Sequence, residues 1–196
     1  RVYRRIGGRE VELTTGAVGT SHGVNMPHSL FNSYPNSSTI SASIIVKTFN
    51  GSRQIGSTSK NVTIRLIDTA RPANKAATLS VSDNRPFTED DNKDRKQIIR
   101  GVSRLTLKAE GVAGSYNSRI SSYEFSYQYT GGAWISTTTN TATHTYPAFS
   151  FPSSGSVYLN IRSRVKDSRG RYSDWVTEWG VARVHYYELP SIGGIS

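Results

Sequence analysis

The sequence predicts an all-β protein built from two β-sandwich modules, and three observations lead to this prediction. Apolar residues recur at every second position along much of the chain, which is the period of a strand with one buried face. Glycines, often beside Asn or a second Gly, interrupt these runs where hairpin turns are needed. No stretch keeps the helical period of about 3.6 residues. The length of 196 residues suits two sandwiches of about 100 residues each.

A β-hairpin is predicted around Asn50-Gly51, because this pair readily supplies the positive φ angles of a tight turn. The strand before the turn is expected to bury one alternating row of side chains, namely Ile40, Ala42, Ile44 and Val46. The strand after it is expected to bury Val62, Ile64 and Leu66.

A boundary between modules is predicted near Pro72, which cannot donate a ladder hydrogen bond and disfavours helix before it. We therefore expect a first module over residues 1–70, a linker over 71–78 and a second module over 79–196. Because residue 1 is Arg rather than Met, we expect a fragment or a processed product whose first module is incomplete at its N-terminus.

The second module carries more aromatic residues on its predicted strands. One strand is expected to place four aromatic residues on a single face: Tyr123, Phe125, Tyr127 and Tyr129. A later strand is expected to point four apolar residues inward: Val157, Leu159, Ile161 and Val165. Residues 176–187 are predicted to form the last strand, and a short helical turn near Asp90–Arg95 is compatible with this all-β architecture.

Composition narrows the functional classes. The net charge of +10 predicts attraction to polyanions, although Lys and Arg are scattered along the chain as on a solvated surface. Cysteine is absent, so disulfides and thiolate metal sites are excluded. No apolar run reaches the roughly 20 residues of a membrane helix, and we expect no membrane insertion. A basic protein that binds nucleic acid or another polyanion is kept as the alternative function.

Enzymatic chemistry is not expected from the motifs. The four histidines lie far apart in sequence, and neither a Gly-x-Ser-x-Gly elbow nor a phosphate-binding glycine loop occurs. We therefore expect no catalytic residues, no cofactor and no metal site. Glu89–Asp94 has part of the spacing of a calcium loop, but Arg95 replaces the required Gly and Gly101 the required Glu. Two interpretations of this segment therefore remain, a solvated acidic loop and a looser calcium site.

Two features are candidate interaction surfaces. Alternation places Arg162, Arg164 and Lys166 on one side of a strand, where three like charges need a partner, an acidic neighbouring strand or solvent. Trp134, Trp175 and Trp179 lie beside predicted turns, where aromatic rings stack on sugars or anchor protein interfaces. The alternative for the tryptophans is that at least one packs in the core.

Four segments, taken in order, resemble the minor tail structural proteins of siphophages: Thr48–Ser57, Ile98–Ser103, Ile120–Tyr123 and Asp167–Ser173. The resemblance covers about residues 35 to 190 and implies tandem immunoglobulin-like or fibronectin type III-like sandwiches. It also implies a virion protein of the tail tip, tube surface or fibre, which acts in assembly and in attachment to the host. The implied partners are other tail proteins, further copies of the chain, and host cell-wall polymer of a Gram-positive envelope; nucleic acid is not among them. It assigns no role to any single residue.

Overall fold

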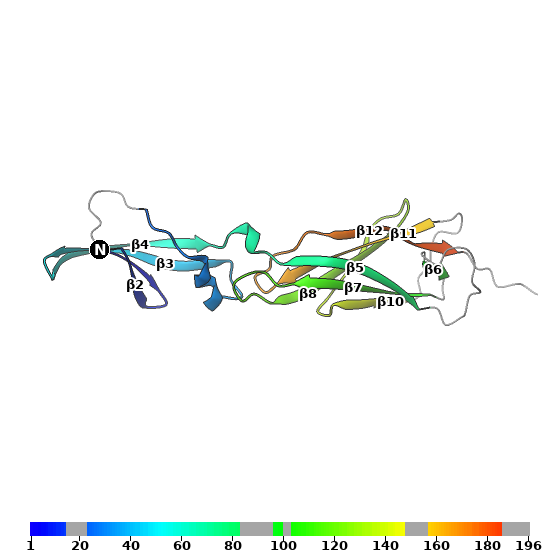
Figure 1. The fold of residues 1–196 in the computed structure, drawn as a ribbon, viewed down its shortest axis with the longest axis horizontal. Helices are drawn as coiled ribbons and strands as arrows, with labels where there is room; N and C mark the ends of the chain where they lie inside the picture. Colours follow the sequence, from blue (N-terminus) through cyan, green and yellow to red (C-terminus); the bar gives the residue numbers. More distant parts are fainter. Residues whose placement is uncertain (15–22, 83–95, 100–102, 148–156, 186–196) are drawn as a thin grey trace, which may run out of the picture. The chain divides into compact units, whose positions relative to one another are not determined.

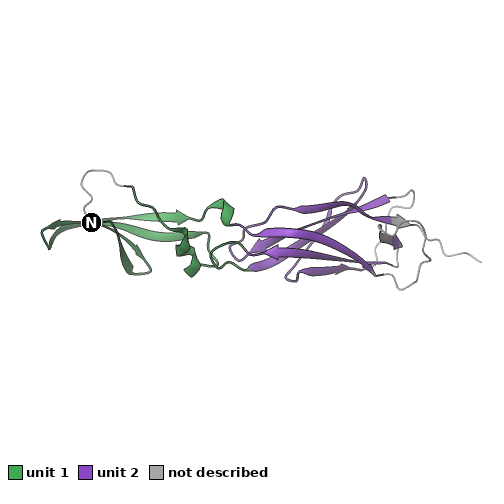
Figure 2. Cartoon of the chain, viewed as in Figure 1, with its two compact units in different colours: residues 1–70, 114–119 green, residues 71–113, 120–196 purple. Residues whose placement is uncertain are grey.

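The computed structural model describes residues 1–14, 23–82, 96–99, 103–147 and 157–185, and almost all of its regular structure is β (Figure 1). These residues form two compact units (Figure 2). Unit 1 comprises residues 1–70 and 114–119, and unit 2 comprises residues 71–113 and 120–196. The short segment 114–119, which lies between two strands of unit 2 in sequence, thus belongs to unit 1.

Unit 1 contains one antiparallel sheet with the strand order β2-β1-β3-β4. Its elements are β1 (Val2–Ile6), β2 (Arg9–Thr14), the 3-10 helix η1 (His28–Ser33), β3 (Thr39–Asn50), β4 (Arg53–Arg65) and the 3-10 helix η2 (Asp68–Ala70). Its buried apolar cluster consists of Phe31, Ile40, Leu66 and Ala70. In the described part of this unit the layer over the sheet is therefore η1 with η2, where we expected the second sheet of a sandwich.

The hairpin of β3 and β4 forms as predicted, with Asn50 paired to Arg53 across the turn. Of the two turn residues expected to have positive φ angles, only Gly51 has one, at +57°. The predicted buried row is wrong beyond Ala42, because Val46 is 42% exposed while Ile45 is 3% exposed. The cluster under η1 covers only the start of β3, so the buried face changes along the strand.

Unit 2 is a sandwich of two sheets, with the strand orders β10-β7-β5 and β6-β12-β11-β8-β9. All neighbouring strands are antiparallel except β6 and β12. The strands are β5 (Ala73–Ser82), β6 (Lys96–Ile99), β7 (Arg104–Val112), β8 (Ile120–Tyr129), β9 (Ile135–Thr139), β10 (Thr143–Tyr146), β11 (Val157–Asp167) and β12 (Val176–His185). The predicted all-β sandwich of the second module is confirmed.

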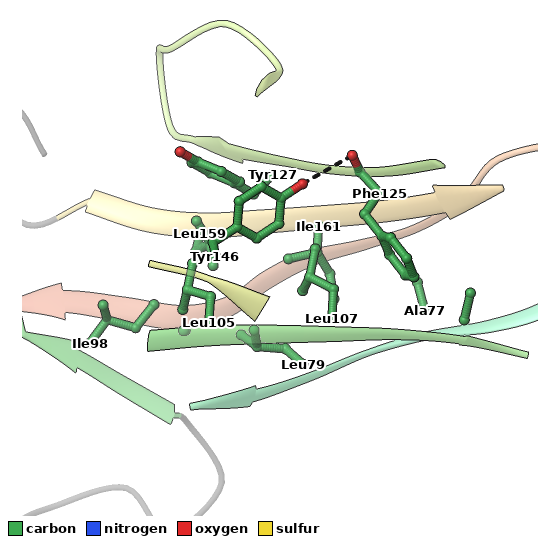
Figure 3. Packing of buried hydrophobic residues seen from close by; sticks show 12 residues of the cluster. Ala77, Leu79, Ile98, Leu105, Leu107, Phe125, Tyr127, Tyr146, Leu159 and Ile161 are labelled. Carbon is green, nitrogen blue, oxygen red and sulfur yellow. Dashed lines mark hydrogen bonds between the residues drawn. The ribbon is translucent and has the colours of Figure 1, made fainter. Parts of the chain in front are cut away.

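The core of unit 2 lies between the two sheets (Figure 3). As the alternation predicts, β8 buries Phe125 and Tyr127, and β11 buries Leu159, Ile161 and Val165. The hydroxyl of Tyr146, on β10 of the smaller sheet, donates a buried hydrogen bond of 3.1 Å to the main-chain oxygen of Phe125 on β8. A polar group inside the core is thereby satisfied and joins the two sheets.

The expected linker over 71–78 is wrong for most of its length. Residues from Ala73 onward belong to β5, which pairs with β7 from Ala73 opposite Val112 to Ser82 opposite Arg104. Ala77 and Leu79 are buried in the core, so Pro72 precedes a strand and does not mark an extended connector. The possible helical turn at 90–95 and the acidic loop at 89–94 lie outside the described residues.

Candidate interaction surface

The three basic residues of β11 lie on the outer face of the five-stranded sheet. Residues Leu159, Ile161 and Val165 of the same strand point into the core, and alternation turns the positions between them outward. The predicted row of Arg162, Arg164 and Lys166 therefore exists. All three residues are only partly exposed, so their surroundings differ from open solvent.

Aromatic rings alternate with these cations. The guanidinium carbon of Arg162 lies 4.2 Å from the ring centroid of Trp134 and 4.2 Å from that of Trp175. The guanidinium carbon of Arg164 lies 4.5 Å from the ring centroid of Trp175 and 4.1 Å from that of Tyr172. All four distances lie within the range of cation–π attraction. The predicted basic row and two of the predicted tryptophans are thus one feature.

The series extends at both ends. The ammonium nitrogen of Lys166 lies 5.1 Å from the Tyr172 centroid. At the other end, the rings of Trp134 and Trp179 meet edge to face with centroids 6.1 Å apart. We call this set the cation–aromatic stack, and in spatial order it contains Trp179, Trp134, Arg162, Trp175, Arg164, Tyr172 and Lys166.

The turn after β11 brings two of the rings over the strand. One carboxylate oxygen of Asp167 accepts the backbone N–H groups of Arg169 and Arg171, each at 3.0 Å. The backbone N–H of Ser173 then donates to the carbonyl of Val165, and its hydroxyl accepts the Val165 N–H. These bonds fold the chain back along β11 and fix the aromatic residues on either side of Ser173. Sequence analysis missed Tyr172, although its position six residues after Lys166, beyond the predicted turn, was a usable signal.

The charges of the stack are balanced unevenly. Glu124 on β8 lies directly opposite Arg164, whose Nε donates to the carboxylate at 2.7 Å. The acidic neighbouring strand considered above is therefore present for Arg164. Arg162 faces the small Ser126, and its Nε is buried without a hydrogen-bond partner among the described residues. Burial lowers the pKa of Arg162, while the charge of Glu124 acts in the opposite direction.

Trp179 is the most exposed ring of the stack, with 69% of its surface accessible. It lies in a bulge of β12, where the pairing with β11 shifts between Leu159 and Ile161. The neighbouring Gly180 has φ of +61°, and its N–H donates to the Asn160 side chain at 2.8 Å. A bulge redirects side chains, and here the glycine conformation and its hydrogen bond hold it in place.

None of the three tryptophans belongs to the buried core cluster of unit 2, so the alternative that one packs in the core is wrong. Among the residues that the structure describes, no group of three His, Cys, Asp or Glu could hold a metal ion. The described residues also include no helix that is long and apolar enough to cross a membrane.

Comparison with known proteins gives the family. The solved structures that resemble the chain include two weak matches, titin domains A168–A170 and the fibronectin(III)-like modules of Clostridium thermocellum CbhA. The titin match has 11% identity and a TM-score of 0.39, and it covers 92% of this chain and 54% of the solved A168–A170 chain. The CbhA match has 14% identity, a TM-score of 0.36 and coverage of 94% and 76%. No curated protein matches the sequence. The family model described as "Siphovirus protein of unknown function (DUF859)" matches residues 1–192, and the chain belongs to this siphovirus family.

Proposed function

We propose that the chain is a structural protein of the siphophage tail and that the cation–aromatic stack is its contact surface for neighbouring tail proteins. Membership of a siphovirus family supports a role in the phage particle. The observation that carries the proposal is the stack itself, a series of Trp, Tyr and Arg side chains in contact on the outer face of the five-stranded sheet.

Protein contact is the use that this surface suits best. Trp, Tyr and Arg are the residue types that dominate the binding energy of protein interfaces. Their neighbours in the stack already restrict these side chains, so binding loses less conformational entropy. Trp179 offers an exposed ring beside the half-buried Trp134. The partners that we propose are other tail proteins and further copies of this chain.

The tail location is tested by electron microscopy of virions labelled with an antibody against this chain. The proposal predicts label on the tail, at its tip, along its tube or on its fibres. Label confined to the head, or particles without label although the denatured chain is detected in infected cells, would overturn it.

Attachment to the host surface is a second candidate, favoured by the exposed ring of Trp179. An aromatic face can stack on a sugar ring of a cell-wall polymer. If attachment is the function, purified chain should compete with virions for adsorption to cells, and a Trp179→Ser chain should compete poorly. Absence of competition by the wild-type chain would remove this candidate.

We further propose that the protein is not an enzyme and that polyanion binding is not its main role. Within the stack, Arg164 has a carboxylate partner and Arg162 lies between two rings, which leaves little of this surface as free charge. Binding through many phosphates weakens steeply with salt, whereas contacts that bury aromatic surface tolerate it. Steep salt dependence of tail assembly would favour the polyanion alternative, and turnover of a cell-wall glycan would establish an enzyme.

A further inference from the structure

A second basic site lies in unit 1, where β1 carries an arginine between two apolar residues of the same alternating row. Val2 is buried, and Ile6 packs against the cluster around Phe31. Arg4 lies between them in the alternation and therefore points to the same side of the sheet. On the neighbouring strand, Arg9 pairs with Ile6, so it shares this face.

A pocket of about 440 Å³ opens at this position between the hairpin of β1 and β2 and the η1 segment. Arg4 and Arg9 provide cations, and Ser29, Ser33 and Tyr34 provide hydroxyl groups. The remaining lining is apolar, from Ile6, Val11, Pro27 and Leu30. No carboxylate is among these described lining residues. We call this the Arg4 pocket.

The carboxylates of the β1–β2 hairpin lie on the opposite face of the sheet from the Arg4 pocket. Glu10 pairs with Arg5 in the strand register and accepts hydrogen bonds from Arg5 and, at 2.8 Å, from Lys47. Glu12 pairs with Tyr3, which lies on that face as well. Period-two alternation thus leaves the cations of the Arg4 pocket without an acidic neighbour on their own strands.

Arg4 also has an unmet hydrogen-bond donor. Its Nη1 is buried and has no partner among the described residues. A buried donor without an acceptor is destabilising, and a buried charge without a counter-ion more so. Two guanidinium groups beside three hydroxyls form a donor set that matches phosphate oxygens, because Arg binds phosphate through paired N–H groups.

We propose that the Arg4 pocket binds a phosphate ester. Arg4 and Arg9 contact the phosphoryl oxygens, and the serine and tyrosine hydroxyls contact the polar organic part. The pocket is larger than a bare phosphate needs, and its apolar lining suits the carbon atoms of an ester. This site is independent of the cation–aromatic stack and of the tail role proposed above.

The test is a titration of the isotope-labelled full chain, followed by NMR, with inorganic phosphate, glycerol 3-phosphate, dimethyl phosphate and neutral glycerol. We expect saturable shifts at Arg4, Arg9 and Tyr34, with the organic phosphates binding more tightly than inorganic phosphate. A preference for glycerol 3-phosphate would assign a terminal phosphate, and a preference for dimethyl phosphate an internal one of a polymer. Equal shifts with glycerol, or shifts spread over all arginines, would overturn the proposal.

Two variants and one control make the test specific. Arg9→Gln, at an exposed position, should weaken binding about tenfold because a charge-assisted hydrogen bond is lost. Arg65→Gln on β4 removes the same charge outside the pocket and should leave binding unchanged. Arg4→Met should abolish binding and, without ligand, raise the melting temperature because an unpaired buried donor is removed. Equal affinity of the Arg9 variant and the wild type would refute the site, even if the Arg4 variant failed to fold.

Discussion

Strands β1 and β11 both carry arginines on one face of a sheet, yet the two strands surround them differently. On β11, Arg162 and Arg164 lie between aromatic rings, and Glu124 on the adjacent strand pairs with one of them. On β1, Arg4 lines a pocket, although each strand has one buried arginine donor without a partner among the described residues, Nη1 of Arg4 and Nε of Arg162. We therefore expect the arginines of β11 to stabilise unit 2 through their rings and carboxylate, and those of the Arg4 pocket to be open to a small ligand.

The two units also differ in how their cores are built. Among the described residues, twelve buried ones from both sheets form the core cluster of unit 2. The cluster of unit 1 has four buried residues in the described ranges 1–14, 23–70 and 114–119, and Phe31 from η1 is the largest of them. Unit 1 therefore depends on fewer apolar contacts, and single substitutions should separate the stabilities of the two units.

The largest effect is expected for Phe31→Ala, which should cost about 3–5 kcal/mol because a fully buried ring leaves a cavity. With so small a cluster, unit 1 should unfold while unit 2 keeps its hydrogen-exchange protection. Phe125→Ala, the matched change in the larger core, should lower the stability of unit 2 by a similar amount. If Phe31→Ala abolished protection in both units together, the units would form one cooperative block.

The next effect concerns the stack. Trp175→Ala should cost about 2 kcal/mol, because it removes a half-buried ring and the cation–π contacts of Arg162 and Arg164. Trp179→Ala serves as the control, since a ring 69% exposed should contribute less than about 0.5 kcal/mol. Denaturant unfolding of both variants measures the difference. Equal stability of the two variants would mean that the stack contributes nothing to the fold.

The units should also respond to opposite extremes of pH. Hydrogen bonds from Lys47 and Arg5 lower the pKa of Glu10, so this stabilisation of unit 1 is present above the unfolded pKa and is lost as pH falls through the folded one. Burial raises the pKa values of Tyr127 and Tyr146, so unit 2 is stabilised below the unfolded pKa and loses this as pH rises through the folded values. Unfolding at a series of pH values measures both effects. The Glu10→Gln variant should lose less stability than the wild type at acid pH, and the Tyr146→Phe variant should lose less at alkaline pH. Unchanged curves would show that other groups govern both limits.

The smallest effect is expected at the tip of the β3–β4 hairpin. Gly51→Val should destabilise unit 1 by about 1–2 kcal/mol, because a β-branched residue is forced to positive φ. Gly56→Ala is the control, since Gly56 has no such φ and a Cβ there would make only an ordinary contact with Thr48. Thermal melting would detect the difference, and equal melting temperatures would show that the turn adapts without strain.

Much of the fold follows from period-two patterns in the sequence. These patterns do not predict which element covers each sheet, and they do not predict the cation–aromatic stack. Alternation identified the core rows of β8 and β11 and the outward basic row. It failed at Val46, because only the packing of η1 decides which face of β3 is covered. Alternation also treated the arginines and the tryptophans as two separate features. The rings lie over β11 because of hydrogen bonds made by the side chains of Asp167 and Ser173, which form only in the folded turn.

The central proposal, that the stack is a contact surface in the virion, is tested most directly by phage that carry Trp179→Ser. The exposed ring contributes little to the fold, so the purified variant should melt like the wild type. Ile67→Ser, at a residue of unit 1 with 42% exposure, is the control. We predict that Trp179→Ser lowers the yield of particles with complete tails, while Ile67→Ser does not. Normal tails in the Trp179→Ser phage would contradict the proposal.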